Sequence, residues 1–279
     1  MKIFVPLKLS RIDCAPIELA DRLRTFWTAY GCTSLEASER KLGAATFHPE
    51  MIKLVMTSES CKLCYLQPTF RPFDSDYGLV LKLQRYLQYQ VVIKPFLGGS
   101  AGKLYLRSVR ALGLGRGLRI VMRKSGWESD SLCAWGEGWE CRLNSVEVSQ
   151  VTVFKQVCGV RCSVPVLEIA YGLERLSFAA SGFRTEVSEA EMAFSRFNLE
   201  ARDVANSLSA FKLFEVGLSL ASAVGVSHRY YLIYDRLLEM IEIYNRVTAK
   251  RFLKRSVVRL LLTRLQRSVK RVAVALTTW

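Results

Sequence analysis

The sequence has few of the residues that mark the best-known catalytic and metal centres. It contains only two histidines, His48 and His228, among 279 residues, so a centre built from several histidine ligands is excluded. No GxSxG motif accompanies either histidine, so the familiar serine-hydrolase arrangement has no support. The segment Gly98–Lys103 resembles a phosphate loop, but leucine occupies positions 97 and 104, where the Walker pattern requires glycine and serine or threonine. P-loop NTPases are therefore excluded as well.

Long apolar stretches are also absent from the sequence. The best candidate for one, Val216–Val226, has at most the length of a buried helix. The N-terminal apolar run is broken by Pro6 and Lys8 and has no small-residue cleavage site, so we expect a soluble, cytoplasmic protein without membrane contact. With 17 glycines and 7 prolines the chain is neither collagen-like nor of low complexity, and an apolar content of 50% is enough for a sizeable core.

The eight cysteines include two close pairs. Cys61 and Cys64 have the spacing of a zinc ribbon or a redox motif, whereas three residues separate Cys158 from Cys162. A zinc site would require both pairs to converge. We predict reduced structural thiols, with no zinc and no disulfide framework.

The charge balance is strongly basic, with 40 Lys and Arg against 25 Asp and Glu, a net charge of +15 and a pI of about 9.6. Such a chain favours polyanionic partners. Ten of the basic residues lie between Arg246 and Trp279, which contains no acidic residue. Apolar residues interleave with them at helical spacing: Phe252, Leu253, Val257, Leu260, Leu261 and Leu265. This pattern indicates either a cationic amphipathic helix laid on RNA or a partner, or a packed terminal helix with a solvated basic face.

Three regions differ in composition, and we expect domains at 1–182, 183–247 and 248–279. The first contains short strand-like runs that do not alternate with long helices, which favours an α+β fold with a mixed or antiparallel sheet. The second has helical periodicity, with one apolar stripe. The strand candidates are 64–67, 89–93, 119–122 and 146–154, and the stripe is Leu237, Leu238, Ile241 and Tyr244.

Three segments are unusual in combination. They are YLQPTFRPFDSDYG at 65–78, WESDSLCAWGEGWE at 127–140 and EIAYGLERL at 168–176, preceded by the shorter GAATFHP at 43–49. In order and approximate spacing this series resembles the bacterial glycyl-tRNA synthetase α subunit, the catalytic half of an α2β2 class II synthetase. The resemblance implies a class II antiparallel sheet flanked by helices and followed by a C-terminal helical region. The helical region after Glu186 follows the third segment after a shorter connecting stretch than in the family that the sequence resembles. This indicates a shortened, divergent member.

The resemblance implies a glycine–tRNA ligase. In that family glycine attacks the α-phosphate of ATP to form glycyl-adenylate, with Mg²⁺, and is then transferred to tRNA(Gly) together with a β subunit. The implied partners are glycine, tRNA(Gly), the β subunit and a second α chain.

The resemblance also assigns the phosphate-binding residues. Arg71 matches the arginine that holds the α-phosphate, and Arg175 the one that reaches the distal phosphates. Arginine suits both roles because its planar fork stays charged and grips phosphate oxygens in pairs. Glu147 is an ATP-site candidate, and Glu140 and Glu147 are candidates for Mg²⁺.

The glycine site is implied at Gln88, Gln90, Trp127 and Glu168. Period two on a strand points both glutamine amides to one face, as a small pocket requires. Glu168 is expected to take the ammonium and Trp127 to close the pocket. Trp135 and Trp139 are expected to be core aromatics.

The sequence departs from the family pattern in one loop. Phe70 and Asp76 stand where arginines are usual, Leu79 replaces a glutamate, and 80–82 are rewritten. Replacing an arginine by an aspartate near a triphosphate should weaken nucleotide binding unless Lys82 or Arg85 compensates. The alternative to an active ligase is therefore a catalytically impaired, synthetase-derived RNA-binding or regulatory protein. A third hypothesis is an adenylate-forming ligase with another acceptor.

Overall fold

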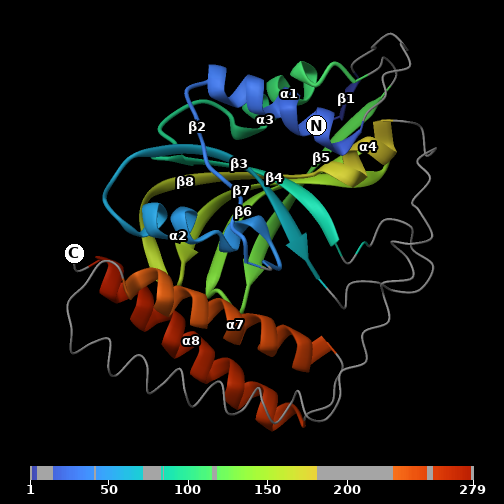
Figure 1. Cartoon of the computed structure of the whole chain (residues 1–279). Helices are drawn as coiled ribbons and strands as arrows, with labels where there is room; N and C mark the ends of the chain where they lie inside the picture. Colours follow the sequence, from blue (N-terminus) through green and yellow to red (C-terminus); the bar gives the residue numbers. More distant parts are fainter. Residues whose placement is uncertain are drawn as a thin grey trace.

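The protein is built on one eight-stranded sheet with helices on both faces (Figure 1). The strand order is β1-β5-β6-β7-β8-β4-β3-β2, and all neighbours are antiparallel except β2 and β3. The predicted α+β fold with a mainly antiparallel sheet is therefore confirmed. The computed structural model describes residues 2–4, 15–40, 42–71, 83, 85–114, 118–180, 229–249 and 254–277.

The strands are mostly long and rich in β-branched and aromatic residues. Their bounds are β1 (Lys2–Phe4), β2 (Thr33–Ser34), β3 (Cys61–Phe70), β4 (Arg85–Lys94), β5 (Arg119–Ser129), β6 (Ala134–Leu143), β7 (Val146–Val157) and β8 (Val160–Gly172). The four predicted strand segments lie in β3, β4, β5 and β7, as expected. Pairing register then decides which side chains meet across the sheet.

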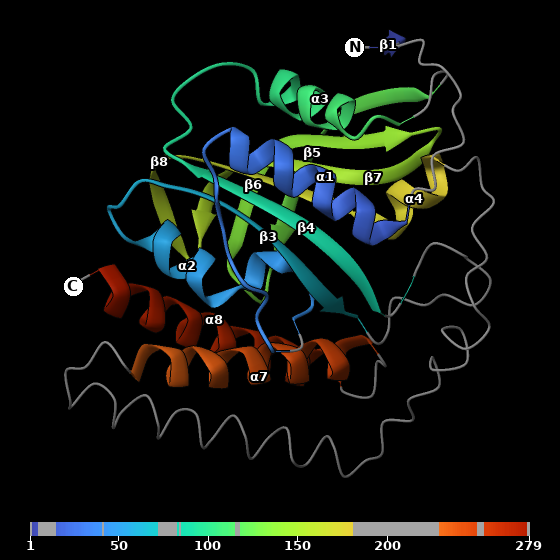
Figure 2. The ribbon, with the colours of Figure 1, turned by 45° about the horizontal axis from the view of Figure 1, so that its top comes forward.

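Helices cover the two faces of the sheet separately. The helices α1 (Pro16–Ala29), α3 (Ala101–Ala111) and α4 (Leu173–Ala180) pack on one face. The short turn η1 (Ala45–Phe47) and the helices α2 (Pro49–Met56), α7 (Arg229–Ala249) and α8 (Arg255–Thr277) pack on the other. Figure 2 shows this separation, with α7 and α8 lying side by side beneath the sheet. Among the described helices none is long and apolar enough to span a membrane.

The predicted apolar stripe of the second region lies on α7. Leu237, Leu238 and Ile241 are buried in the core beneath the sheet, and Tyr244 packs against it, which confirms the stripe. Most of the helical region predicted at 183–247 falls within 181–228 and lies outside the described residues.

The basic tail forms α8, which is amphipathic as predicted. Leu261 and Leu265 are buried against the sheet side. Leu260, however, is 53% exposed, so its assignment to the apolar face was wrong. At 100° per residue it lies about 120° around the helix from the centre of the buried pair.

One of the two tryptophans expected in the core lies on the surface. Trp139 is partly buried and packs with the α1, α3 and α4 side, but Trp135 is 45% exposed. Trp135 stands near the start of β6, beside a register shift between it and Gly136. Burial nevertheless alternates regularly from Ala134 to Gly138, so Trp135 shares the exposed side of this part of β6 with Glu137.

The first cysteine pair does not face a common site. Cys61 lies in the core on the α2 side of the sheet, and Cys64 in the core on the α1 side. Burial raises the pKa of both thiols, so the neutral form is favoured at either position.

Candidate active site

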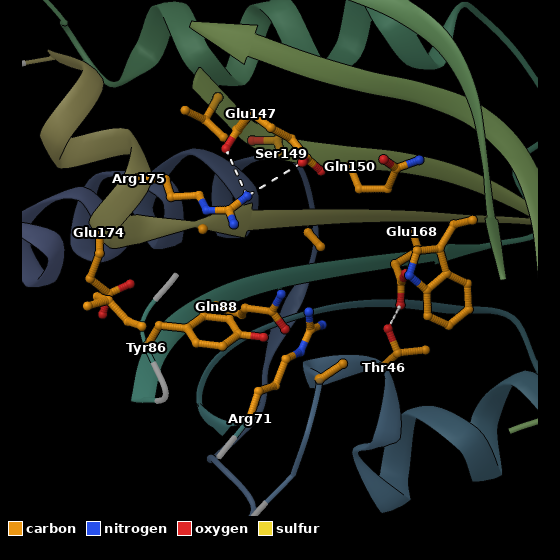
Figure 3. A pocket seen from close by; sticks show the side chains of 16 residues that line it. Thr46, Arg71, Tyr86, Gln88, Glu147, Ser149, Gln150, Glu168, Glu174 and Arg175 are labelled. Atoms are coloured by element: carbon orange, nitrogen blue, oxygen red, sulfur yellow. Dashed lines mark hydrogen bonds and ion pairs between the residues drawn. The ribbon is translucent and has the colours of Figure 1, made fainter. Parts of the chain in front are cut away.

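A cavity of about 310 Å³ opens on the sheet face that carries η1 and α2, near the point where β3 and β8 end (Figure 3). Polar and charged side chains from η1, β4, β7, β8 and α4 converge on it. The principal ones are Thr46, Arg71, Tyr86, Gln88, Glu147, Gln150, Glu168, Glu174 and Arg175. Trp127 of β5 forms part of the wall.

Strand order explains why two distant arginines share this cavity. Arg71 directly follows β3, and Arg175 follows β8 in the first turn of α4. Both strands are antiparallel to β4, which lies between them, so they run in the same direction and end at the same edge. In Figure 3 the two side chains enter the cavity from opposite sides, with Gln88 between them.

Local contacts orient each guanidinium. Arg71 Nε donates to the carbonyl oxygen of Gly43 at 2.6 Å, and its guanidinium carbon lies 5.5 Å from the ring centre of Tyr86. Arg175 Nη1 lies 3.5 Å from the Glu147 carboxylate and donates to the Glu147 carbonyl oxygen at 3.3 Å. The Arg175 side chain is 36% exposed, so this cationic end of the cavity is open to solvent.

The inner end of the cavity contains a buried acid. Glu168 is 2% exposed, and its Oε1 accepts hydrogen bonds from Thr46 Oγ1 at 2.8 Å and from Gln90 Nε2. Burial raises the pKa of the Glu168 carboxyl from 4.5 to about 8, and the two hydrogen bonds oppose part of that rise. An ionised Glu168 would therefore be stabilised by a cation placed beside it in the cavity.

The turn that carries Thr46 is held by side chains from three elements. The amide of Ala45 donates to Gln88 Oε1 of β4 at 2.8 Å, and its carbonyl accepts from Tyr65 of β3 at 3.0 Å. Tyr234 of α7 donates to the carbonyl of Phe47 at 3.0 Å. The C-terminal helices therefore help to position the inner end of the cavity.

His48 has a structural place next to this turn. Its Nδ1 accepts from the amide of Glu50, with Pro49 opening α2, and its Nε2 lies 3.0 Å from the carbonyl oxygen of Glu36. Burial lowers the pKa of this histidine, so the neutral ring that can accept at Nδ1 is favoured. His48 therefore has the geometry of a helix cap for α2.

The two glutamines of β4 point to the same face, as period two predicts. Gln88 lines the cavity, whereas Gln90 is fully buried behind Glu168. Trp127 packs edge-on against Phe154, with ring centres 5.7 Å apart, and lines the cavity together with Glu168.

A family model described as the glycyl-tRNA synthetase alpha subunit matches residues 17–278. The chain belongs to this family. It is therefore an aminoacyl-tRNA ligase that uses ATP. Among solved structures, the chain is similar to PylSc, a pyrrolysyl tRNA synthetase of Desulfitobacterium hafniense. The identity is 12%, over 60% of this chain and 67% of that chain, and the TM-score is 0.42.

The glycyl-tRNA synthetase resemblance assigned two glutamates to Mg²⁺, and the structure separates them. Glu147 lines the cavity beside Arg175, but Glu140 is not part of the lining and is ion-paired with Arg142. Within the described ranges no group of three or more His, Cys, Asp or Glu forms a metal cage. A single carboxylate fits Mg²⁺ that is held mainly by water and substrate phosphates. Glu147 is thus the one of the two that can serve such an ion.

Several residues that line the cavity of this alpha subunit are not among those predicted from the sequence. Thr46 lies in the early segment that carries the resemblance, but nothing local indicates that it contacts an acid 122 positions later. Glu174 Oε1 accepts from the amide of Leu87 at 2.8 Å and so ties α4 to β4. Gln150 of β7 lines the cavity, and its Nε2 has no hydrogen-bond partner within the part of the chain that the structure describes. The altered loop at 72–82 lies outside the described residues.

Proposed function

We propose that this alpha subunit activates glycine with ATP to form glycyl-adenylate, the first step of glycine–tRNA ligation. The observation that carries the proposal is the charge distribution of one cavity. A buried carboxylate, Glu168, lies at the inner end, and two guanidinium groups, from Arg71 and Arg175, lie at the open end. An amino acid with its ammonium inward and a triphosphate outward complements this arrangement.

The inner end suits a small zwitterion. Glu168 would accept the ammonium, and Gln88 and Thr46 supply polar atoms nearby. Trp127 lines the same cavity as Glu168, and its indole would limit the room left for the side chain of a larger amino acid. Steric exclusion by a rigid aromatic wall is the simplest way to select glycine, because glycine offers no side chain to recognise.

The open end suits the phosphate chemistry. A carboxylate oxygen of glycine would attack the α-phosphorus of ATP, and the bond to the bridging oxygen would break with release of pyrophosphate. Arg71 is placed to neutralise charge on the α-phosphate and Arg175 charge on the distal phosphates. Glu147 holds Arg175 in position and would share Mg²⁺ with the phosphates, where the ion neutralises developing charge.

The second step, transfer of glycine to tRNA(Gly), would require the tRNA and the partner subunits. A ribose hydroxyl at the 3′ end of tRNA(Gly) would attack the glycyl carbonyl, and AMP would leave. We include the β subunit and a second α chain as partners, following the α2β2 organisation of the family, and a cytoplasmic location.

Glycine-dependent exchange of pyrophosphate into ATP tests the first step directly. The full chain is assayed alone and with its β subunit, beside Arg175→Ala and the control Arg110→Ala, which alters an exposed arginine on α3. We expect exchange that requires glycine, survives Arg110→Ala and is lost in Arg175→Ala. A panel with alanine and serine tests the amino-acid preference.

Each other outcome has a definite meaning. Absence of exchange from folded protein, even with the β subunit, would refute the ligase proposal for this chain and favour the impaired RNA-binding alternative. Exchange with another amino acid or acid in place of glycine would indicate an adenylate-forming ligase with a different substrate.

A further inference from the structure

The outer face of α8 is strongly basic. Its basic residues, and Lys254 directly before the helix, are all exposed. None of them forms an ion pair with another described residue; those on the helix are Arg255, Arg259, Arg264, Arg267, Lys270 and Arg271. The buried residues Leu261, Leu265 and Val269 occupy the opposite side of the helix. The row from Arg255 to Arg271 extends over about 24 Å at 1.5 Å per residue.

A surface hollow of about 480 Å³ adjoins the C-terminal half of this row. It is bordered by the exposed indole of Trp135, by Gln156 at the end of β7 and by Arg267 and Lys270 of α8. Gln266 of α8 donates to the carbonyl oxygen of residue 130 at 3.3 Å, which fixes the helix to the turn between β5 and β6. The hollow therefore combines an accessible aromatic surface with cations and amides.

We propose that the basic face of α8 and the hollow beside Trp135 form an RNA-binding surface. The cations would contact successive phosphates, and Trp135 would stack on an unpaired base. The proposal deepens the proposed function, on which it rests for the identity of the natural RNA as tRNA.

The lining of the hollow favours RNA over an acidic protein. Glu128 and Asp130 also border it, and their carboxylates would repel a densely acidic peptide. A nucleotide carries its negative charge only on the phosphate, and the amino groups of its base can donate to these carboxylates. Arg267 and Lys270 remain available to the phosphate on the α8 side.

The surface is separate from the cavity that contains Arg175. Glu147 of the cavity and Gln156 of the hollow stand at opposite ends of β7, about 30 Å apart at the usual rise of a strand. A tRNA whose 3′ end entered the cavity would have to extend at least this far to touch α8, and its acceptor arm is an elongated duplex.

Binding of a short fluorescein-labelled single-stranded RNA, followed by anisotropy over a range of salt concentrations, tests the proposal on the full chain. The variant Arg264→Gln/Arg267→Gln/Lys270→Gln removes three cations from α8. Its matched control is Lys103→Gln/Arg107→Gln/Arg110→Gln, which removes three exposed cations from α3. Glutamine keeps the helix propensity of both elements close to that of the wild type.

We expect the slope of log K for RNA association against log salt to become less steep by about 2 in the α8 variant, at ~0.7 per lost phosphate contact. The α3 control should keep the slope of the wild type. Trp135→Ala should weaken binding by about fivefold to 100-fold, as for one lost base stack. Equal losses in the α8 and α3 variants would overturn the proposal, since that result means attraction by net charge alone. RNA binding unchanged in the α8 variant but reduced binding of polyglutamate would also overturn it, in favour of an acidic protein partner.

Pyrophosphate exchange separates this proposal from the proposed function, because adenylate formation needs no RNA. If pyrophosphate exchange is intact but RNA binding does not depend on α8, the proposed RNA-binding surface is refuted and the ligase proposal stands. If RNA binding depends on α8 but the protein shows no pyrophosphate exchange, the ligase proposal is refuted and the RNA-binding surface stands.

Discussion

Replacement of Glu168 by glutamine should make the protein more stable at neutral pH while abolishing its activity. The carboxyl is buried, and its pKa is raised from 4.5 to about 8 by loss of hydration. The folded protein therefore keeps a proton on Glu168 over a range in which the unfolded chain has already lost it. Glutamine has nearly the same shape, and its oxygen can still accept from Thr46 and Gln90.

The sign and size of the effect follow from proton linkage. Because the folded pKa is the higher one, the stabilising contribution of the protonated form is complete below pH 4.5 and is lost as pH rises toward 8. Between these limits the folded state binds about one proton more than the unfolded state, so wild-type stability falls by about 1.4 kcal/mol per pH unit from this group. From pH 5 to pH 7 the loss amounts to about 3 kcal/mol.

Urea unfolding at pH 5, 6, 7 and 8 measures this contribution. We expect the difference in unfolding free energy between Glu168→Gln and the wild type to increase with pH at the slope given above. The control Glu39→Gln replaces an exposed acid that does not line the cavity, and it shows whether the slope is specific to Glu168→Gln. A difference between Glu168→Gln and the wild type that is flat over this range would refute the argument that the carboxyl is protonated in the empty cavity.

The same group should couple glycine binding to proton release. At pH 7 about nine in ten unliganded molecules carry the proton, given a pKa of about 8. An ammonium beside Glu168 favours the ionised form, so the apparent affinity for glycine should rise as pH increases from 6 toward 8. Calorimetry in buffers of different ionisation enthalpy measures the protons released. Binding without proton release would place the ammonium elsewhere.

Three further substitutions probe other parts of the cavity. Arg175→Ala should lower the pyrophosphate-exchange rate by about 10²–10³-fold, as expected for loss of one preorganised donor to the transition state, whereas Arg110→Ala should match the wild type. Trp127→Ala should reduce the preference for glycine over alanine by about tenfold or more in kcat/KM, and an unchanged ratio would exclude the indole as the size filter. Tyr234→Phe removes the donor to the Phe47 carbonyl, so it should cost about 1–3 kcal/mol in urea unfolding and raise the KM for glycine more than that for ATP. Equal increases in both KM values would argue against a role in positioning the glycine end.

Much of the local structure follows from the sequence. Alternation along β4 placed Gln88 and Gln90 on one face, and the helical period of the tail predicted an amphipathic α8. These features depend on the geometry of neighbouring residues, which repeats every two residues in a strand and every 3.6 in a helix. Trp135 is the exception: it lies on the same exposed side of β6 as Glu137, and periodicity alone does not say which face of a strand the tertiary fold leaves uncovered.

The site itself depended on contacts between residues far apart in the chain. The resemblance identified Arg71, Arg175 and Glu168 one by one, but their joint arrangement follows from β4 lying between two strands that end at the same edge. Glu140 and Glu147 are seven residues apart and equally plausible in the sequence, yet only the second lines the cavity.

The sequence by itself therefore determined the family, the fold class, the faces of individual strands and helices and the set of candidate side chains. Only the tertiary structure decided that Thr46 binds Glu168, that Tyr234 supports the turn that carries Thr46, and that the basic face of α8 meets Trp135. The physical reason is that periodicity acts over a few residues. Strand order and helix packing depend on how the whole apolar surface is buried, and they alone set distances between segments more than a hundred residues apart.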